Sequence, residues 1–153
     1  MNEPILVSAC LLGVACRYDG QAKLHPAVAA LMDTYTLIPF CPEVYGGLPT
    51  PREPAELQNG RVATSSGRDV TDAYRRGAQE TLTLAMRMGC RVAILKERSP
   101  SCGKGTVHDG RFQGGLVPGN GVTAALLMEN GLTVYGETDV ESGAFPAGAP
   151  ESK

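Results

Sequence analysis

Three of the five cysteines lie in loops that contain glycine or proline, and not inside apolar runs. These three are Cys10, Cys41 and Cys102. Thiolates are common protein ligands of zinc and of iron–sulfur clusters. Because structural zinc normally has four protein ligands, three thiolates favour a catalytic zinc or an iron–sulfur cluster. A four-iron cluster held by three cysteines leaves one iron free to bind a substrate as a Lewis acid.

Short apolar runs alternate along the chain with longer segments of helical character. Four runs without polar alternation predict strands that are covered on both faces: ILVSA (5–9), TLIPF (36–40), RVAIL (91–95) and LTVYG (132–136). The segments between them predict helices over 25–33, 71–89 and 120–131. This alternation predicts an α/β layered fold with a mostly parallel sheet of about four strands.

The predicted sheet has a consequence for the three loop cysteines, because each of them follows one of the apolar runs. Parallel strands end at the same edge of a sheet, so thiols from distant parts of the chain are expected to meet at one rim. Open α/β sheets bind their ligands at that rim. The sequence therefore predicts a metal or cluster site there.

The remaining two cysteines are predicted to behave differently. Cys90 precedes the third apolar run, which places it at the opposite edge of the sheet as a small buried hydrophobic residue. Cys16 leaves three alternatives open: a fourth ligand, a redox partner of Cys10 or a bystander. The spacing of Cys10 and Cys16 lacks the Cys-X-X-Cys form typical of thioredoxin-like redox proteins.

The length of the chain and the positions of its turn residues predict one domain. The 153 residues suit a single compact unit. Two polar inserts, 56–70 and 104–115, contain Asn-Gly and Asp-Gly pairs typical of hairpins or loops. We expect the domain to span 1–140 and a disordered tail, rich in Gly, Pro, Ala and Ser, to occupy 141–153.

Composition indicates an ordinary globular protein with no general affinity for polyanions. The formal charge is -2, with 42% hydrophobic and 20% charged residues. This balance argues against long nucleic acids as partners but leaves nucleotide-sized ligands open. No apolar run approaches the ~20 residues that cross a bilayer, and the N-terminus lacks a signal-peptide pattern. We therefore expect a cytoplasmic protein without a membrane partner, whose cysteines are thiols or metal ligands.

Three blocks of sequence together resemble the thiouracil desulfidase family, long catalogued as a domain of unknown function. The blocks are SACLLG…CRYDG (8–20), CPEVYGGLPTPREPAE (41–56) and LKERSPSCGKGT (95–106). The resemblance runs over roughly 4–140 and is to the short form, without the extra C-terminal domain of some members.

The resemblance implies a fold and a cofactor. It implies a Rossmann-like three-layer domain that carries an oxygen-sensitive [4Fe-4S] cluster with one open iron site. Cys10, Cys41 and Cys102 match the family's ligand positions, whereas Cys16 stays outside the ligand set.

The resemblance also implies an activity. Family members remove sulfur from thiolated pyrimidines by non-redox Lewis-acid hydrolysis, which leaves a carbonyl and releases sulfide. The expected substrate is a 2-thiouracil-like base, nucleoside or nucleotide.

Such chemistry needs a proton shuttle close to the cluster. Glu43 lies two residues after Cys41 and is expected to be the general acid/base. Ser101 adjoins Cys102 and is expected to orient the water or to hydrogen-bond a cluster sulfur, with Ser99 as the alternative.

Other charged side chains near these motifs have two possible roles each. Arg52 is expected to neutralise charge on the cluster or substrate, or else to pair with Glu53 or Glu56. Lys96 and Lys104 flank the third cysteine loop and could supply charge in the same way. The two histidines are expected to be structural or exposed.

Two other function classes remain open from the sequence. One is a metal- or cluster-binding module with a structural or sensing role. The other is a thiol redox protein that uses Cys10 and Cys16.

Overall fold

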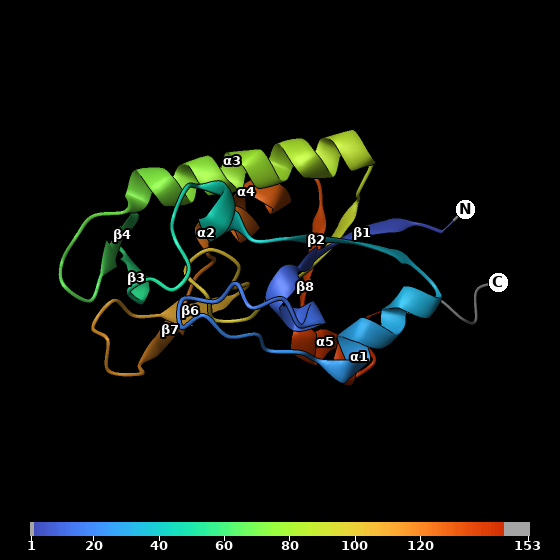
Figure 1. Ribbon diagram of the computed structural model, residues 1–153, viewed down its shortest axis with the longest axis horizontal. Helices are drawn as coiled ribbons and strands as arrows, with labels where there is room; N and C mark the ends of the chain where they lie inside the picture. The colour runs from blue at the N-terminus through green and yellow to red at the C-terminus, as the bar shows by residue number, and fades with distance from the viewer. Residues whose placement is uncertain (1, 146–153) are drawn as a thin grey trace.

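A computed structural model describes residues 2–145, and a four-stranded sheet lies at its centre (Figure 1). The strand order is β2-β1-β5-β8, and all neighbouring strands run parallel. The strands are β1 (Pro4–Ser8), β2 (Thr36–Phe40), β5 (Val92–Leu95) and β8 (Thr133–Gly136). They coincide with the four apolar runs to within one residue, so the predicted α/β class is confirmed.

Helices cover both faces of this sheet and complete a Rossmann-like three-layer arrangement (Figure 1). One face carries α2 (Pro42–Tyr45), α3 (Thr71–Met88) and α4 (Val122–Glu129). The other carries α1 (Pro26–Ala29), α5 (Glu137–Glu141) and two short 3₁₀ helices, η1 (Ala9–Leu12) and η2 (Ala30–Asp33). The predicted helix over 25–33 is thus split into α1 and η2.

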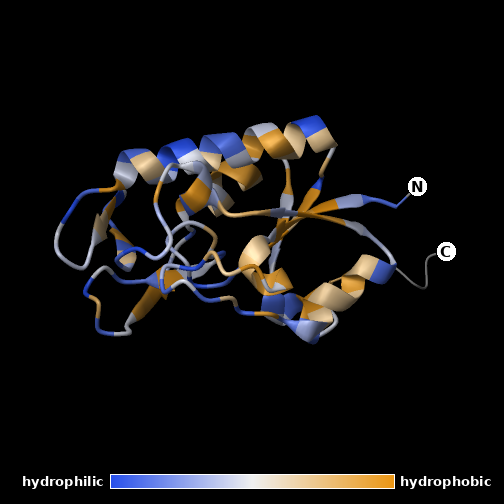
Figure 2. Cartoon of the chain, in the orientation of Figure 1, coloured by the Kyte–Doolittle hydropathy of each residue, from blue (hydrophilic) through white to orange (hydrophobic). Residues whose placement is uncertain are grey.

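Alternating side chains of each strand belong to two separate hydrophobic cores, one on each face of the sheet. Leu6 and Leu95 pack under α3 and α4, while Ile5, Val7 and Ile94 pack against the opposite layer, and all five are 0% exposed. Figure 2 shows the same pattern, with hydrophobic colour along the central strands and hydrophilic colour on the outer face of α3. Because both faces are buried, the strands show no polar alternation.

Local signals explain the bounds of the longest helix, α3. The Asp69 carboxylate accepts the backbone N–H of Thr71 at 2.8 Å at the start of the helix. Gly89 ends it with φ 72°, a left-handed conformation that glycine adopts without strain. The predicted helix over 71–89 is therefore confirmed.

Two antiparallel hairpins lie side by side at one end of the molecule (Figure 1). The first joins β3 (Ala55–Gln58) to β4 (Arg61–Thr64) through the predicted Asn-Gly turn, and the second joins β6 (Thr106–His108) to β7 (Leu116–Pro118) through a longer loop. Glu56 fastens them together, because one oxygen of its carboxylate accepts the N–H groups of Gly110 and Phe112, each at 3.0 Å.

The packed structure continues past the predicted domain end at residue 140. Phe145 is 6% exposed, and its ring lies 5.6 Å from that of Tyr35 and 4.8 Å from that of Tyr135, measured between centroids. Residues 141–145 of the expected tail therefore belong to the fold, because one aromatic side chain anchors them. The rest of the expected tail, 146–153, lies outside the described residues.

No helix within residues 2–145 combines the length and apolar character that crossing a membrane requires.

Candidate active site

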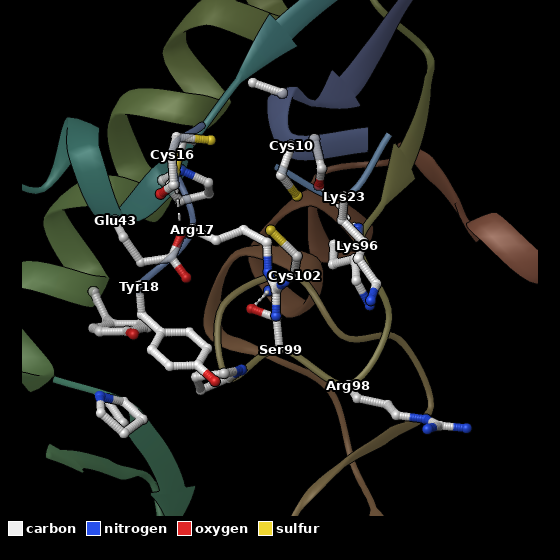
Figure 3. A pocket seen from close by; sticks show the side chains of 18 of the residues that line it. Cys10, Cys16, Arg17, Tyr18, Lys23, Glu43, Lys96, Arg98, Ser99 and Cys102 are labelled. Atoms are coloured by element: carbon white, nitrogen blue, oxygen red, sulfur yellow. Dashed lines mark hydrogen bonds between the residues drawn. The ribbon is translucent and has the colours of Figure 1, made fainter. Parts of the chain in front are cut away.

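A pocket of about 530 Å³ opens where three adjacent strands end. Cys10 follows β1, Cys41 follows β2 and Cys102 lies in the loop after β5, and all three line this pocket. In Figure 3 the sulfur atoms of Cys10 and Cys102 point into the same space. The structure thus brings together thiols that lie up to 92 positions apart in the sequence, from 10 to 102.

Cys10 and Cys41 are held by short helical turns. Cys10 belongs to η1, and its backbone carbonyl accepts the N–H of Gly13 at 3.2 Å and of Lys23 at 2.9 Å. Cys41 is the residue before α2, whose first position is Pro42, a residue preorganised for a helical first turn. The backbone at Cys10 and at Cys41 is therefore held in place by the short helix next to it.

Two glycines let α2 pack directly on α3. A methyl group on Gly77 would lie 1.9 Å from the carbonyl oxygen of Pro42, and one on Gly46 would lie 2.0 Å from that of Ala73. No side chain fits at either position without moving the backbone. This contact of the two helices fixes the position of Cys41 and Glu43.

The loop that carries Cys102 is tied down from two sides. The hydroxyl of Ser99 accepts the N–H groups of Ser101 and Cys102, each at 3.0 Å. The start of α4 also donates to the loop, since the N–H of Val122 reaches the carbonyl of Pro100 at 2.9 Å. Ser99 lines the pocket, so the alternative serine named from the sequence is the one beside the thiols.

Ser101 does not face the pocket, which corrects the expectation that it orients a water. The residue is 0% exposed, and its hydroxyl hydrogen-bonds that of Thr123 at 2.8 Å in the interior. The sequence placed Ser101 beside Cys102 but could not tell which way its side chain points. We therefore assign Ser101 the task of holding the Cys102 loop against α4.

This assignment predicts a stability effect without a catalytic one. Ser101→Ala leaves the Thr123 hydroxyl buried without its partner, which costs about 1–3 kcal/mol of unfolding free energy, measurable by urea denaturation. The double variant Ser101→Ala, Thr123→Val removes both partners and recovers most of that loss. A Ser101→Ala variant of normal stability that loses turnover would instead place the hydroxyl in the reaction.

The Glu43 carboxylate lies among the thiols. Its Oε1 accepts a hydrogen bond from Cys41 Sγ at 3.6 Å, and the residue lines the pocket. Among the causes that raise the pKa values of the three thiols, the negative charge of Glu43 comes after burial and, for Cys41, also after its hydrogen bond with Cys16. Figure 3 shows the carboxylate directed toward the pocket.

Burial and neighbouring groups raise the pKa values of the three thiols. Burial, followed by the charge of Cys41, raises the pKa of Cys10 to about 11, and Lys96 partly offsets this. Burial raises the pKa of Cys102 well above its usual value. A hydrogen bond with Cys16 and then burial raise the pKa of Cys41. Cationic iron would favour the thiolates and release their protons.

The arrangement of the thiols fits a cluster better than a single ion. Among residues 2–145, no three His, Cys, Asp or Glu side chains converge closely enough to hold one metal ion. A zinc ion needs its ligands to meet at about 2.0–2.3 Å from one point, whereas the irons of a cluster are separate and each takes its own thiolate. Three thiols around one pocket therefore suit a multi-iron group.

Positive side chains surround the thiols. Arg52 lines the pocket and donates to the carbonyl of Cys16 at 3.0 Å, and it pairs with neither of the two glutamates proposed as alternatives. Lys96 also lines the pocket and forms an ion pair with Glu137 at 3.0 Å. Lys104 is exposed and lies outside the lining residues, so it does not share the expected role.

The two histidines differ from each other. His25 is structural, as expected: it accepts the N–H of Val28 at 3.4 Å and contacts Glu141 at 2.8 Å. His108 lines the pocket, and its buried Nδ1 has no hydrogen-bond partner among the described residues. No local pattern in the sequence indicates this placement, because it depends on the packing of the β6–β7 hairpin against the hairpin that carries Glu56.

Of the two remaining cysteines, Cys16 lines the pocket and Cys90 does not. Cys90 is 5% exposed in the core beneath α3 and lies outside the pocket lining, as predicted. Cys16 lines the pocket, and its backbone carbonyl accepts a hydrogen bond from Cys41 Sγ at 3.7 Å. The pocket therefore contains four thiols, one more than the predicted ligand set.

Comparisons with known proteins agree with this geometry. Residues 5–139 match the model of the 2-thiouracil desulfurase family. The uncharacterized protein YbbK of Bacillus subtilis (strain 168) is 42% identical over 146 residues, which span 89% of this chain and 97% of YbbK. A solved structure of the [4Fe-4S]-dependent thiouracil desulfidase TudS is 49% identical and superposes with a TM-score of 0.87, covering 94% of this chain and 97% of TudS. On the family match and these similarities, the chain belongs to the 2-thiouracil desulfurase family.

Proposed function

We propose that this protein is a desulfidase that converts a thiolated pyrimidine and water into the carbonyl compound and sulfide, with a [4Fe-4S] cluster as its cofactor. One observation carries the proposal: thiols from three adjacent strand ends share a pocket with a carboxylate. The similarity to TudS, at 49% identity over 94% of the chain, supports the same cofactor and substrate class.

Cys10, Cys41 and Cys102 would hold the cluster. Bound there, it supplies an iron without a protein ligand, a Lewis acid that withdraws electrons from a carbon–sulfur bond.

Glu43 moves the protons of the hydrolysis. Its carboxylate accepts one proton from the water that attacks the thiocarbonyl carbon, and then returns it to the departing sulfur. The second proton of that water is released when the new hydroxyl becomes the carbonyl, so the products are the carbonyl compound, hydrosulfide and a proton. Proton transfer of this kind needs a carboxylate within reach of the reacting atoms, and Oε1 already lies 3.6 Å from Cys41 Sγ. The contact of α2 with α3 keeps that carboxylate in place.

The rest of the pocket binds the substrate. Its volume of about 530 Å³ falls in the range of small-molecule sites. Arg17, Tyr18 and His108 line the pocket together with the aromatic ring of Tyr74, and can contact the polar edges and the face of a pyrimidine. A base, a nucleoside and a nucleotide all belong to this substrate class, whereas long nucleic acids do not.

The cytoplasm is the compartment that suits this chemistry. All five cysteines are free thiols, and cytosolic reductants keep thiols available for cluster assembly.

The test is an anaerobic reconstitution. The purified chain is incubated with iron and sulfide, its metal and sulfide contents and visible spectrum are recorded, and 2-thiouracil is added. We expect a brown protein with four irons per chain that forms uracil and sulfide in equal amounts. Stoichiometric zinc without a chromophore would overturn the cofactor assignment. An intact cluster that leaves every thiolated pyrimidine unchanged would favour a sensing or structural module instead.

A further inference from the structure

Cys16 is the pocket thiol to which the proposed reaction gives no task. It is 8% exposed and lies at the pocket wall next to Cys41. The two residues are in contact, since Cys41 Sγ reaches the carbonyl oxygen of Cys16 at 3.7 Å.

The backbone around this pair is fixed by contacts that involve no metal. The guanidinium of Arg52 donates to the Cys16 carbonyl at 3.0 Å, and the backbone N–H of Arg52 donates to the carbonyl of Tyr18 at 2.8 Å. These bonds join the loop after η1 to the segment after α2. The meeting of Cys16 and Cys41 is therefore a property of the folded chain.

The other thiols are placed differently. Cys10 and Cys102 line the pocket but hydrogen-bond neither Cys16 nor Cys41 among the contacts of the described residues. Cys90 lies in the core away from the pocket. Cys41 is the least buried of the five, because it alone has intermediate exposure. It is thus the proposed ligand that small oxidants reach first when the pocket is open.

We propose that Cys16 and Cys41 form a reversible disulfide in the cluster-free protein, which protects Cys41 from irreversible oxidation. The disulfide itself depends only on the juxtaposition of the two residues. Its protective purpose rests on the proposed function, because that function makes Cys41 a cluster ligand.

The chemistry is thiol–disulfide exchange with a low-molecular-weight disulfide such as oxidised glutathione. One pocket thiolate attacks the oxidant and releases one reduced glutathione, and the second pocket thiol then displaces the other glutathione from the mixed disulfide. The two cysteines lose two electrons and two protons, and one oxidised glutathione becomes two reduced molecules. A dithiol reductant reverses the reaction.

The alternative fate of an exposed ligand thiol is oxidation to sulfinic or sulfonic acid, which cellular thiols do not reverse. A disulfide prevents this further oxidation of Cys41, and thiol reductants convert it back to two thiols. Cys16 then acts only when the cluster is missing, which explains a fourth thiol beside a three-thiolate site.

The experiment uses the full-length apoprotein and oxidised glutathione. After incubation, free thiols are blocked, and the chain is digested with trypsin and analysed by tandem mass spectrometry. We expect two of the five thiols to be lost, and tryptic peptide 1–17, which contains both Cys10 and Cys16, to be linked to peptide 24–52, which contains Cys41. Fragment ions should place the link on Cys16 and the blocking group on Cys10. Cys16→Ala and the conservative Cys16→Ser should lose this cross-link, and Cys90→Ala should keep it.

Cluster assembly provides the second readout. Oxidised wild-type protein should take up iron and sulfide only after treatment with dithiothreitol. Hydrogen peroxide should convert Cys41 to sulfinic or sulfonic acid in Cys16→Ser but not in the wild type. A Cys10–Cys16 link, or stable glutathione adducts without a cross-link, would overturn the proposal. A correct cross-link in a protein that never takes up a cluster would overturn the proposed function and leave the disulfide standing.

Discussion

Replacing Cys10, Cys41 or Cys102 with alanine is expected to abolish the cluster and, with it, turnover. Each of the three thiols comes from a different strand end, so each variant removes the one proposed ligand at that strand end. Each variant would leave two protein ligands for four irons, so two irons would lack a protein ligand. Anaerobic reconstitution followed by iron and sulfide analysis measures the loss directly, because the brown chromophore should be missing.

Cys90→Ala is the matched control for these variants. Cys90 is a buried thiol outside the pocket lining, so its replacement removes a sulfur atom of similar burial but no proposed ligand. It should keep the cluster and the activity. Cys16→Ala should also keep the cluster. If any single ligand variant assembles a full cluster, the three-thiolate assignment is wrong.

Replacing Glu43 with glutamine is expected to lower kcat by about 10²- to 10⁴-fold, the usual contribution of a general acid/base. Glutamine keeps the size and the hydrogen-bonding capacity of the side chain but cannot carry the proton. Since Glu43 is not a proposed ligand, the cluster spectrum and iron content should match those of the wild type. Steady-state assays with 2-thiouracil at saturating concentration give the comparison.

Glu80→Gln provides the control for this charge change, because Glu80 is exposed on α3 and is not among the residues that line the pocket. It should leave kcat unchanged. Full activity of Glu43→Gln would remove the proton-transfer role and leave Glu43 as a structural carboxylate of the Cys41 loop. Loss of the cluster in Glu43→Gln would make it a residue of cofactor binding.

The sheet was predictable because each strand is buried on both faces. Continuous apolar runs such as residues 36–40 and 91–95 have few alternatives to a covered parallel strand. Parallel order then places every strand end at one rim, so the meeting of the thiols after β1, β2 and β5 followed from the strand assignment alone.

What the sequence could not supply was the direction of individual side chains. Ser99 and Ser101 lie three residues and one residue before Cys102, and only the packing of α4 decides that Ser101 turns inward to Thr123. The pocket position of His108 depends on contacts between two hairpins that are far apart in sequence. Phe145 sits in a segment of low-complexity composition, and its burial between two tyrosine rings has no local signal.

Cys16 shows a further limit of the same kind. Its spacing from Cys10 suggested a pair within one loop, whereas the fold gives it Cys41 as its neighbour through the contact of two loops. The proposed disulfide therefore pairs Cys16 with Cys41 and not with Cys10.

The bonds between the Cys102 loop and α4 make the third proposed ligand depend on residues that are synthesised later. The loop is closed by N–H groups of Val122 and Thr123, which the ribosome adds about twenty residues after Cys102. Until those residues leave the exit tunnel, the nascent chain offers only the first two thiols in a formed environment. A chain truncated before α4 is therefore expected to take up no iron on reconstitution, however well its first strands pair.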